Sequence, residues 1–437
     1  MLRRTIQIFI AVTARLRRDE DGAMVVTIAL LMTLLMGLLG VGVEVGSWYM
    51  TRRSLQTAAD AAAIAGALEE ARGSAGRVTS AATLEAKRNG AQPASDVIRI
   101  NAPPTSGAFK DDPQAVEAII TRPRERLFSA VLSADAVSIS ARAVARVRAT
   151  GEACVLALDP ASSGAITAQG STTLKMQGCL LAANSTSNAA VDMGGSATVA
   201  ADGLWTAGDV STGGSSNLSF VKPPTTHAWP LPDPYAALPI PSPGPCKENN
   251  IKIDKPLAQP LDPGTYCGDF SVGSQGVVVL NPGTYYIDRG SIDINAQAQI
   301  RCNCSAPGSG VTFVLTSSGN TSQIGTVSIN GSATIDLRAP SEPGAPFRGV
   351  LFYQDRRAPA GKANTFNGGS TIALNGAFYF PAQRVNWNGN TAASAGAACL
   401  QIIARTASFS GNSTLDNSGC AAMGAKPVTT TAAALGE

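Results

Sequence analysis

The chain has 437 residues, which is enough for a membrane anchor and two further domains. Charged residues make up 15% of it and the formal net charge is +3. No basic cluster is interleaved with aromatic residues, so we expect no nucleic-acid partner. The single histidine, and the lack of GxSxG, P-loop and HExxH patterns, argue against common hydrolase and nucleotide-binding sites.

The first element is an uncharged apolar stretch, Ala23–Val43. In a helix that rises about 1.5 Å per residue it extends about 30 Å, the thickness of the hydrocarbon core of a bilayer. Because only a helix satisfies its own backbone there, we predict a transmembrane signal anchor over 23–47. A cleaved signal peptide has a shorter apolar region followed closely by a small-x-small site, and a buried soluble helix is the other alternative.

The charges that flank this stretch predict its orientation. Basic residues near a span favour the cytoplasmic side, and five precede it: Arg3, Arg4, Arg15, Arg17 and Arg18. Two, Arg52 and Arg53, follow it. We therefore expect a single-pass membrane protein. Segment 1–22 would be cytoplasmic, and the part that follows the anchor would be periplasmic or extracellular.

The outer end of the anchor holds the candidate membrane and partner contacts. Gly42 and Gly46 have the spacing that lets two helices approach closely, which predicts self-association through the membrane helix. Glu44 is either an interfacial carboxylate or the partner of a charge on another subunit. Trp48 and Tyr49 lie where an interfacial aromatic belt would be.

Residues 48–150 predict a helix followed by a small sheet. The Ala-rich segment after the aromatic pair should continue the membrane helix outward as one rod. Segments 96–101 and 115–121 resemble short strands, and 137–148 alternates as a half-buried strand does. A short helix is expected over 124–132. A sheet packed on the outward half of a helix would be a pilin-like α+β region.

Residues 151–437 form a Gly-, Ser-, Thr- and Asn-rich region that predicts a mainly-β domain. Short units recur at Gly170, Gly195, Gly331, Gly369 and Gly411, each followed by Ser or Asn, then Thr and an aliphatic residue. Such units favour a β-solenoid, or β-helix, in which Leu174, Ile335 and Ile372 point inward and Asp336 outward. A β-sandwich is the alternative. The Pro-rich segment 222–246 cannot pair as a central strand and should be an extended surface excursion.

Eight cysteines, all after residue 150, predict disulfides formed in an oxidising compartment. They are Cys154, Cys179, Cys246, Cys267, Cys302, Cys304, Cys399 and Cys420. The closest spacings favour Cys154–Cys179 and Cys399–Cys420. A metal site on Cys302-x-Cys304 is the alternative for that pair. We predict no cofactor and no metal.

A glycosidase or lyase site would need acidic residues, or acidic and basic residues, clustered on one face of the β domain. The candidates Asp288, Arg289, Asp293, Asp336, Arg338 and Asp355 are scattered along the chain. This favours a non-enzymatic protein over a polysaccharide-active enzyme. A surface adhesin or glycan-binding protein has the same predicted architecture and stays open.

The N-terminal motifs resemble those of the Tad (Flp) pilus-assembly TadE/TadG-like family. The resemblance covers about residues 17–70 and rests on Glu44-x-Gly46, the aromatic pair, Arg52-Arg53-x-Leu55-Gln56 and the Ala-rich run 58–63. It implies a bacterial envelope protein that is anchored in the inner membrane and serves assembly or anchoring of tight-adherence pili, with other Tad pilus-assembly proteins as partners. Thr27 stands where prepilin-like members carry a carboxylate, so we expect the N-terminus to stay uncleaved.

Overall fold

The computed structural model describes residues 20–369, 372–389, 391–392 and 399–436. The segment 1–19, with the five arginines that predict the orientation, lies outside the described residues. The chain forms two compact units, residues 1–148 with 431–437 (unit 1) and residues 149–430 (unit 2). The predicted boundary at 150 falls close to this division. The last strand differs from expectation, because it belongs to unit 1.

Unit 1 is built on one helix, α2 (Glu20–Ala71), so the predicted continuous rod is confirmed. A 3-10 turn (Ala75–Arg77) and α3 (Val78–Arg88) follow it. β1 (Val97–Asn101), β2 (Ala115–Arg124) and the first part of β3 (Val137–Ala157) pair as an antiparallel meander. These are the three predicted strands. The helix predicted over 124–132 is wrong: β2 runs to Arg124, and a single 3-10 turn (Ser129–Val131) follows.

Small side chains let the outer half of α2 pack closely on this meander. The fully buried residues of the helix are Leu55, Ala58, Ala59, Ala62, Ala63 and Ala67. They contact Val116, Ala118 and Ile120 of β2 and the inward residues of β3. A Cβ placed on Gly66 would lie 2.7 Å from Cγ1 of Val116, so glycine is required there. The Ala-rich sequence therefore sets the distance between helix and sheet.

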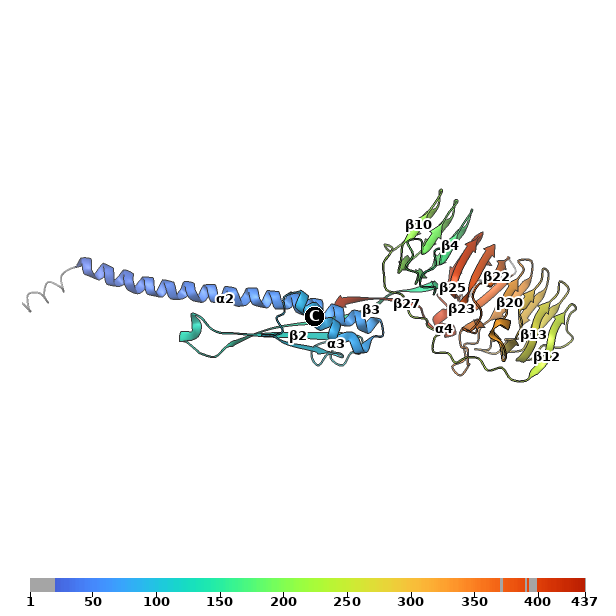
Figure 1. Ribbon diagram of the computed structural model, residues 1–437, viewed down its shortest axis with the longest axis horizontal. Helices are drawn as coiled ribbons and strands as arrows, with labels where there is room; N and C mark the ends of the chain where they lie inside the picture. The colour runs from blue at the N-terminus through green and yellow to red at the C-terminus, as the bar shows by residue number, and fades with distance from the viewer. Residues whose placement is uncertain (1–19, 370–371, 390, 393–398, 437) are drawn as a thin grey trace, which may run out of the picture. The chain divides into compact units, whose positions relative to one another are not determined.

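Unit 2 is a stack of short parallel strands (Figure 1). The first ladder has the spatial order β12 (Cys246–Ile253), β13 (Gly264–Val272), β15 (Gly283–Asp288), β18 (Val311–Thr316), β21 (Val350–Gln354), β23 (Ile372–Gly389), β25 (Leu400–Ser410), β3, β6 (Leu180–Ala183) and β9 (Gly203–Thr206). We call each repeat of the chain that contributes one strand to this ladder a coil. Each strand pairs with the equivalent strand of the next coil. Parallel ladders of this kind contradict the β-sandwich alternative, which pairs strands largely antiparallel.

Three further ladders lie beside the first. One contains β10 (Val210–Thr212), β7 (Val191–Met193), β4 (Ile166–Ala168), β22 (Ala363–Gly368), β19 (Val327–Ile329) and β16 (Ile292–Ile294), joined through β25, β23 and β13. A second contains β11 (Asn217–Phe220), β8 (Thr198–Ala201), β5 (Thr173–Gln177), β26 (Asn412–Asp416) and β24 (Thr391–Ala392). The third contains β14 (Val277–Leu280), β17 (Gln299–Cys302) and β20 (Thr334–Arg338), which pairs with β23. A short helix, α4 (Cys420–Met423), and β27 (Thr429–Leu435) end the chain.

The order of the coils in space differs from their order in the sequence. The first three coils, from β3 to β11, stack on one side of the last coil, which contains β25. The Pro-rich segment then carries the chain to the far end, where β12 begins, and the remaining coils return to β25. Strands β4 and β10 therefore lie at one end of the stack and β12 and β13 at the other (Figure 1). The sequence predicted that the Pro-rich segment leaves the sheet. It did not predict that the later coils lead back to the earlier ones at β25.

The interior of the stack is one continuous apolar column. It contains Leu174, Ile335 and Ile372, and Asp336 is exposed, so the predicted inward and outward residues are confirmed. Aromatic rings follow one another through neighbouring coils at 5.3–6.1 Å: Tyr266, Tyr285, Phe313, Phe352 and Phe378. Packing of this kind buries the inward face of every coil against the next.

The first ladder is buried on its other face as well. Residues of the Pro-rich segment, with α4 and the segment after it, cover that face. The Nε1 of Trp205 donates to Trp229 O, the hydroxyl of Tyr379 donates to Asp233, and Arg356 donates to Tyr235 O. Burial on both faces explains why these strands are continuously apolar and do not alternate.

Candidate membrane-proximal site

The inner half of α2 has the properties of a membrane anchor. Among the described residues, one helix, Met24–Ala71, is long and apolar enough to cross a bilayer. From Met24 to Leu39 every described side chain is exposed, including those of Leu30, Leu34 and Leu38. The same helix becomes amphipathic only after Trp48, where it packs on the sheet. An uncovered apolar helix of this length needs an apolar environment.

Glu44 is the only acidic residue between Asp21 and Asp60, and the structure gives it partners within its own chain. Its side chain is 3% exposed. Oε1 accepts a hydrogen bond of 2.7 Å from the backbone N–H of Leu127, and Oε2 accepts one of 2.7 Å from that of Ser129. These two hydrogen bonds form an intramolecular clamp, and the pairing of Glu44 with another subunit stays a prediction.

The clamp is formed by the turn between β2 and β3, which lies beside α2 (Figure 1). Two further contacts fix its position along the helix. The ring of Phe128 covers Gly40, where an added Cβ would lie 2.6 Å from the ring. The guanidinium of Arg126 lies 5.7 Å from the ring centroid of Trp48, a cation–π contact. We call residues 126–132 the clamp turn.

The remaining interface candidates face away from the clamp turn. Among the described residues, none lies within 4 Å of a Cβ placed on Gly42 or Gly46. Tyr49 is exposed. The structure therefore leaves this glycine pair open, and its role in self-association stays a prediction.

Two buried charge clusters hold the sheet of unit 1. Glu117 is fully buried and accepts hydrogen bonds from Asn101, Arg142 and Thr105. Burial opposes its ionisation, but these donors outweigh burial and lower its pKa to about 2. Arg122 forms a two-pronged ion pair with Asp96, with N–O distances of 2.6 and 2.7 Å. These groups are structural, since every carboxylate oxygen among them is used.

All eight cysteines are paired. The predicted disulfides Cys154–Cys179 and Cys399–Cys420 are confirmed. The other two are Cys246–Cys267 and Cys302–Cys304. The second of these replaces the metal site considered for that pair. Cys154–Cys179 and Cys246–Cys267 each join neighbouring coils of the stack.

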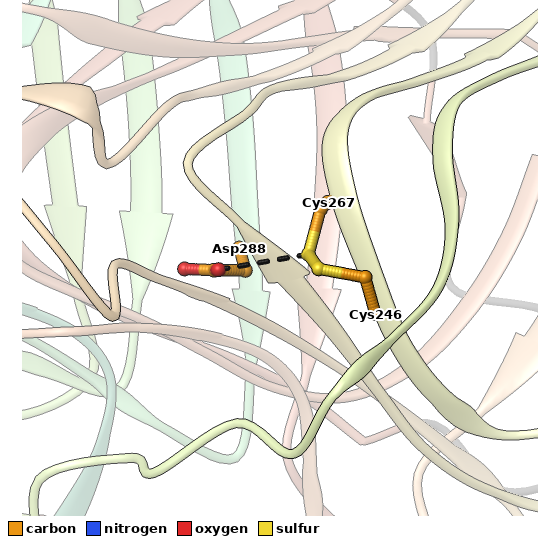
Figure 2. A group of neighbouring side chains, drawn as sticks. All are labelled: Cys246, Cys267 and Asp288. Atoms are coloured by element: carbon orange, nitrogen blue, oxygen red, sulfur yellow. Dashed lines mark hydrogen bonds between the residues drawn. A yellow bond between two sulfur atoms is a disulfide. The ribbon is translucent and has the colours of Figure 1, made fainter.

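One group of side chains has the compactness of a metal site: Cys246, Cys267 and Asp288 (Figure 2). The carboxylate of Asp288 lies 3.6 Å from Sγ of Cys267. Metal ligation by cysteine requires a thiolate, and both sulfurs are in the disulfide. Asp288 instead accepts hydrogen bonds from the backbone N–H and the hydroxyl of Ser318, each 2.7 Å long. The group is therefore structural: the disulfide joins β12 to β13, and Asp288 binds the segment after β18.

The candidate acidic and basic residues of unit 2 fall into separate groups, and one row of the first ladder holds Asp288 and Asp355 on either side of Thr316. Asp288 pairs with Arg289 at 3.1 Å, and Asp355, fully buried, pairs with Arg357 at 2.6 Å. Burial and the nearby Asp269 raise the pKa of Asp293. Asp336 and Arg338 line a surface pocket of 310 Å³ beside Cys302 and Cys304. Of these candidates, the structure thus brings together Asp288 and Asp355 in one row, and Asp336 and Arg338, which are two residues apart in the sequence, in one pocket.

Sequence reasoning missed the clamp turn. A signal was present, because the apolar run Leu127, Phe128, Val131 and Leu132 interrupts a turn between two strands, where polar residues are usual. The contacts of Glu44 with Leu127 and Ser129 span 83 and 85 positions of the sequence, so no local pattern indicates them.

The apolar helix and the packed head of unit 1 define the chain as a candidate single-helix membrane protein. Residues 22–71 match the family model described as putative Flp pilus-assembly TadE/G-like. The chain therefore carries a TadE/G-like segment, which includes Glu44 but not the clamp turn that binds its carboxylate. No curated protein and no solved structure matches the chain.

Proposed function

We propose that the protein is a membrane-anchored envelope protein for the assembly or anchoring of Tad (tight-adherence) pili, and that it is not an enzyme. One observation carries the proposal. The segment that matches the TadE/G-like model coincides with α2, whose inner half is apolar and uncovered and whose outer half holds a folded head. Other Tad pilus-assembly proteins would be its partners.

The orientation is part of the proposal. The five arginines before the span favour a cytoplasmic N-terminus, with the packed head of unit 1 and the whole of unit 2 on the outer side of the inner membrane. The four disulfides of unit 2 support this placement, because disulfides persist in oxidising compartments.

Unit 2 would act as a β-solenoid scaffold. Parallel pairing of each coil with the next and the continuous aromatic column support the solenoid interpretation. Asp288 and Asp355 are each held in an ion pair, which supports a structural rather than a catalytic role for these carboxylates.

Removal of unit 2 tests its role. The hydroxyls of Thr150 and Thr430 lie 2.9 Å apart, so a chain in which residue 150 is joined to residue 430 keeps unit 1 and β27 without a gap. Unit 1 has a hydrophobic core of its own. A strain that lacks the gene is complemented with this excised chain or with the full chain, and filaments and surface attachment are scored.

Loss of filaments with the excised chain, at equal amounts of membrane-bound protein, supports the scaffold role. Normal filaments with lost attachment would favour the adhesin alternative. Normal filaments and attachment in the strain that lacks the gene altogether would contradict the proposed function.

A further inference from the structure

The clamp turn exposes an apolar surface that no described residue of unit 1 covers. Leu127 is 74% exposed, Phe128 54%, Val131 91% and Leu132 81%. These four side chains lie in a six-residue segment whose other members, Ser129 and Ala130, are small. A cluster of exposed apolar side chains on a surface turn indicates that the turn is buried against a protein or a membrane.

The contacts of the turn give its position along the membrane helix. Phe128 lies at the level of Gly40, the backbone of Leu127 and Ser129 at the level of Glu44, and Arg126 at the level of Trp48. The turn therefore reaches past the charged residue of the helix into the apolar segment. From the level of Trp48 to the level of Gly40 the turn changes from the cationic Arg126 to the apolar Phe128.

The helix sequence places these levels relative to a bilayer. Asp19, Glu20 and Asp21 mark the inner end of the apolar segment. A hydrocarbon core about 30 Å thick then extends about 20 residues along the helix, to about Val43. Gly40 lies about 5 Å inside that limit, at about 1.5 Å per residue. Trp48 and Arg126 lie outside it, where aromatic and basic side chains favour the membrane–water interface.

We propose that the clamp turn is a second membrane-inserted element: Leu127, Phe128, Val131 and Leu132 enter the hydrocarbon of the leaflet nearest to unit 1. The proposal rests on membrane anchoring by α2. It commits to lipid as the occupant because the apolar tip is continuous with the uncovered apolar face of the helix. Insertion also shields Glu44, since the same turn supplies both N–H groups that its carboxylate requires at this depth.

Two membrane contacts have a mechanical consequence. A single helix allows the head of unit 1 to rotate and tilt freely on the bilayer. Because the clamp holds the turn on one face of the helix, insertion of the turn restricts how the helix and the head of unit 1 tilt in the bilayer. The open face with Gly42 and Gly46 would then be presented to neighbours in the membrane in one orientation.

Spin labelling tests the insertion directly. All eight native cysteines are paired, so a nitroxide can be attached selectively to a Val131→Cys variant of the full chain. The chain is placed in nanodiscs of phosphatidylethanolamine and phosphatidylglycerol. The accessibility of the label to oxygen, which concentrates in lipid, is compared with its accessibility to a water-soluble nickel chelate. Leu84→Cys on α3, also exposed, is the aqueous control, and Leu34→Cys in the apolar helix is the lipid control.

We expect the oxygen-to-nickel ratio at position 131 to be severalfold above that at position 84 and to approach that at position 34. A ratio at 131 equal to that at 84 would overturn the proposal. Low accessibility to both reagents at 131 would also overturn it, because it would show a protein partner instead of lipid. An aqueous ratio at position 34 would reject the membrane anchor itself, so the two failures are distinguishable.

Discussion

The clamp on Glu44 yields the sharpest prediction about the described structure. In a Glu44→Gln variant the side chain keeps its size but has one acceptor oxygen in place of two. Its amide group would then face the N–H of either Leu127 or Ser129, donor against donor. At least one of the two 2.7 Å hydrogen bonds is lost. A hydrogen bond to a charged group contributes about 1.5–3 kcal/mol. Local opening of the clamp turn should therefore become about 10- to 150-fold more frequent.

Amide hydrogen exchange of the full chain in nanodiscs measures this opening, because exchange of a protected amide follows local unfolding. Peptides that cover residues 125–133 should exchange faster in the variant, and peptides from the core of β3 should not. Glu70→Gln, on the same helix but away from the turn, is the matched control. Unchanged exchange at 125–133 in Glu44→Gln would refute the clamp.

Three further predictions concern the packing and charges of the two units. Gly66→Leu should destabilise unit 1 by about 1–3 kcal/mol, because the new side chain collides with Val116; thermal unfolding should show this, and Gly76→Leu, in open space among the described residues, should change little. The pKa of Glu117 is lowered from 4.5 to about 2, so its stabilising contribution is present above pH 4.5 and is lost as the pH falls toward 2. This contribution is about 3 kcal/mol; urea titrations at pH 5 and pH 2 should show the loss, and a Glu117→Gln variant that kept the same pH dependence would refute the assignment. Ile335→Asp should destabilise unit 2 by more than about 2 kcal/mol, whereas Asp336→Ser should stay within about 0.5 kcal/mol; equal effects in urea unfolding would contradict the inward and outward assignment.

The local sequence pattern predicted those helices and strands in which apolar residues recur at regular positions. The uncharged run before Glu44 predicted the membrane helix, and alternation in 137–148 predicted the first part of β3, with Ile139, Ala141 and Ala143 buried as expected. The recurrent Gly-Ser-x-Thr units predicted that Ile335 and Ile372 share one interior, and these two residues are neighbours in the ladder of β20 and β23.

Long-range contacts were beyond local pattern for two physical reasons. The clamp on Glu44 depends on backbone N–H groups. Every turn has such groups, so no residue type in the sequence indicates which of them will bind Glu44. The order of the coils depends on where the Pro-rich segment leads, and this is set by contacts such as Tyr379 with Asp233 across 146 residues. The helix expected over 124–132 failed because the contacts of Leu127 and Ser129 with Glu44 hold the backbone as a turn.

The measurement that most directly tests the central claim is the topology of the full chain in the cell. A reporter that is active only in the cytoplasm and one that is active only outside it are each fused after Glu437 and expressed at equal levels. The account predicts that the cytoplasmic reporter is silent and that the other is active. The reason is that α2 crosses the membrane once, and the rest of the chain follows it on the outer side. An active cytoplasmic reporter with a silent partner would contradict the anchored, outward-facing arrangement.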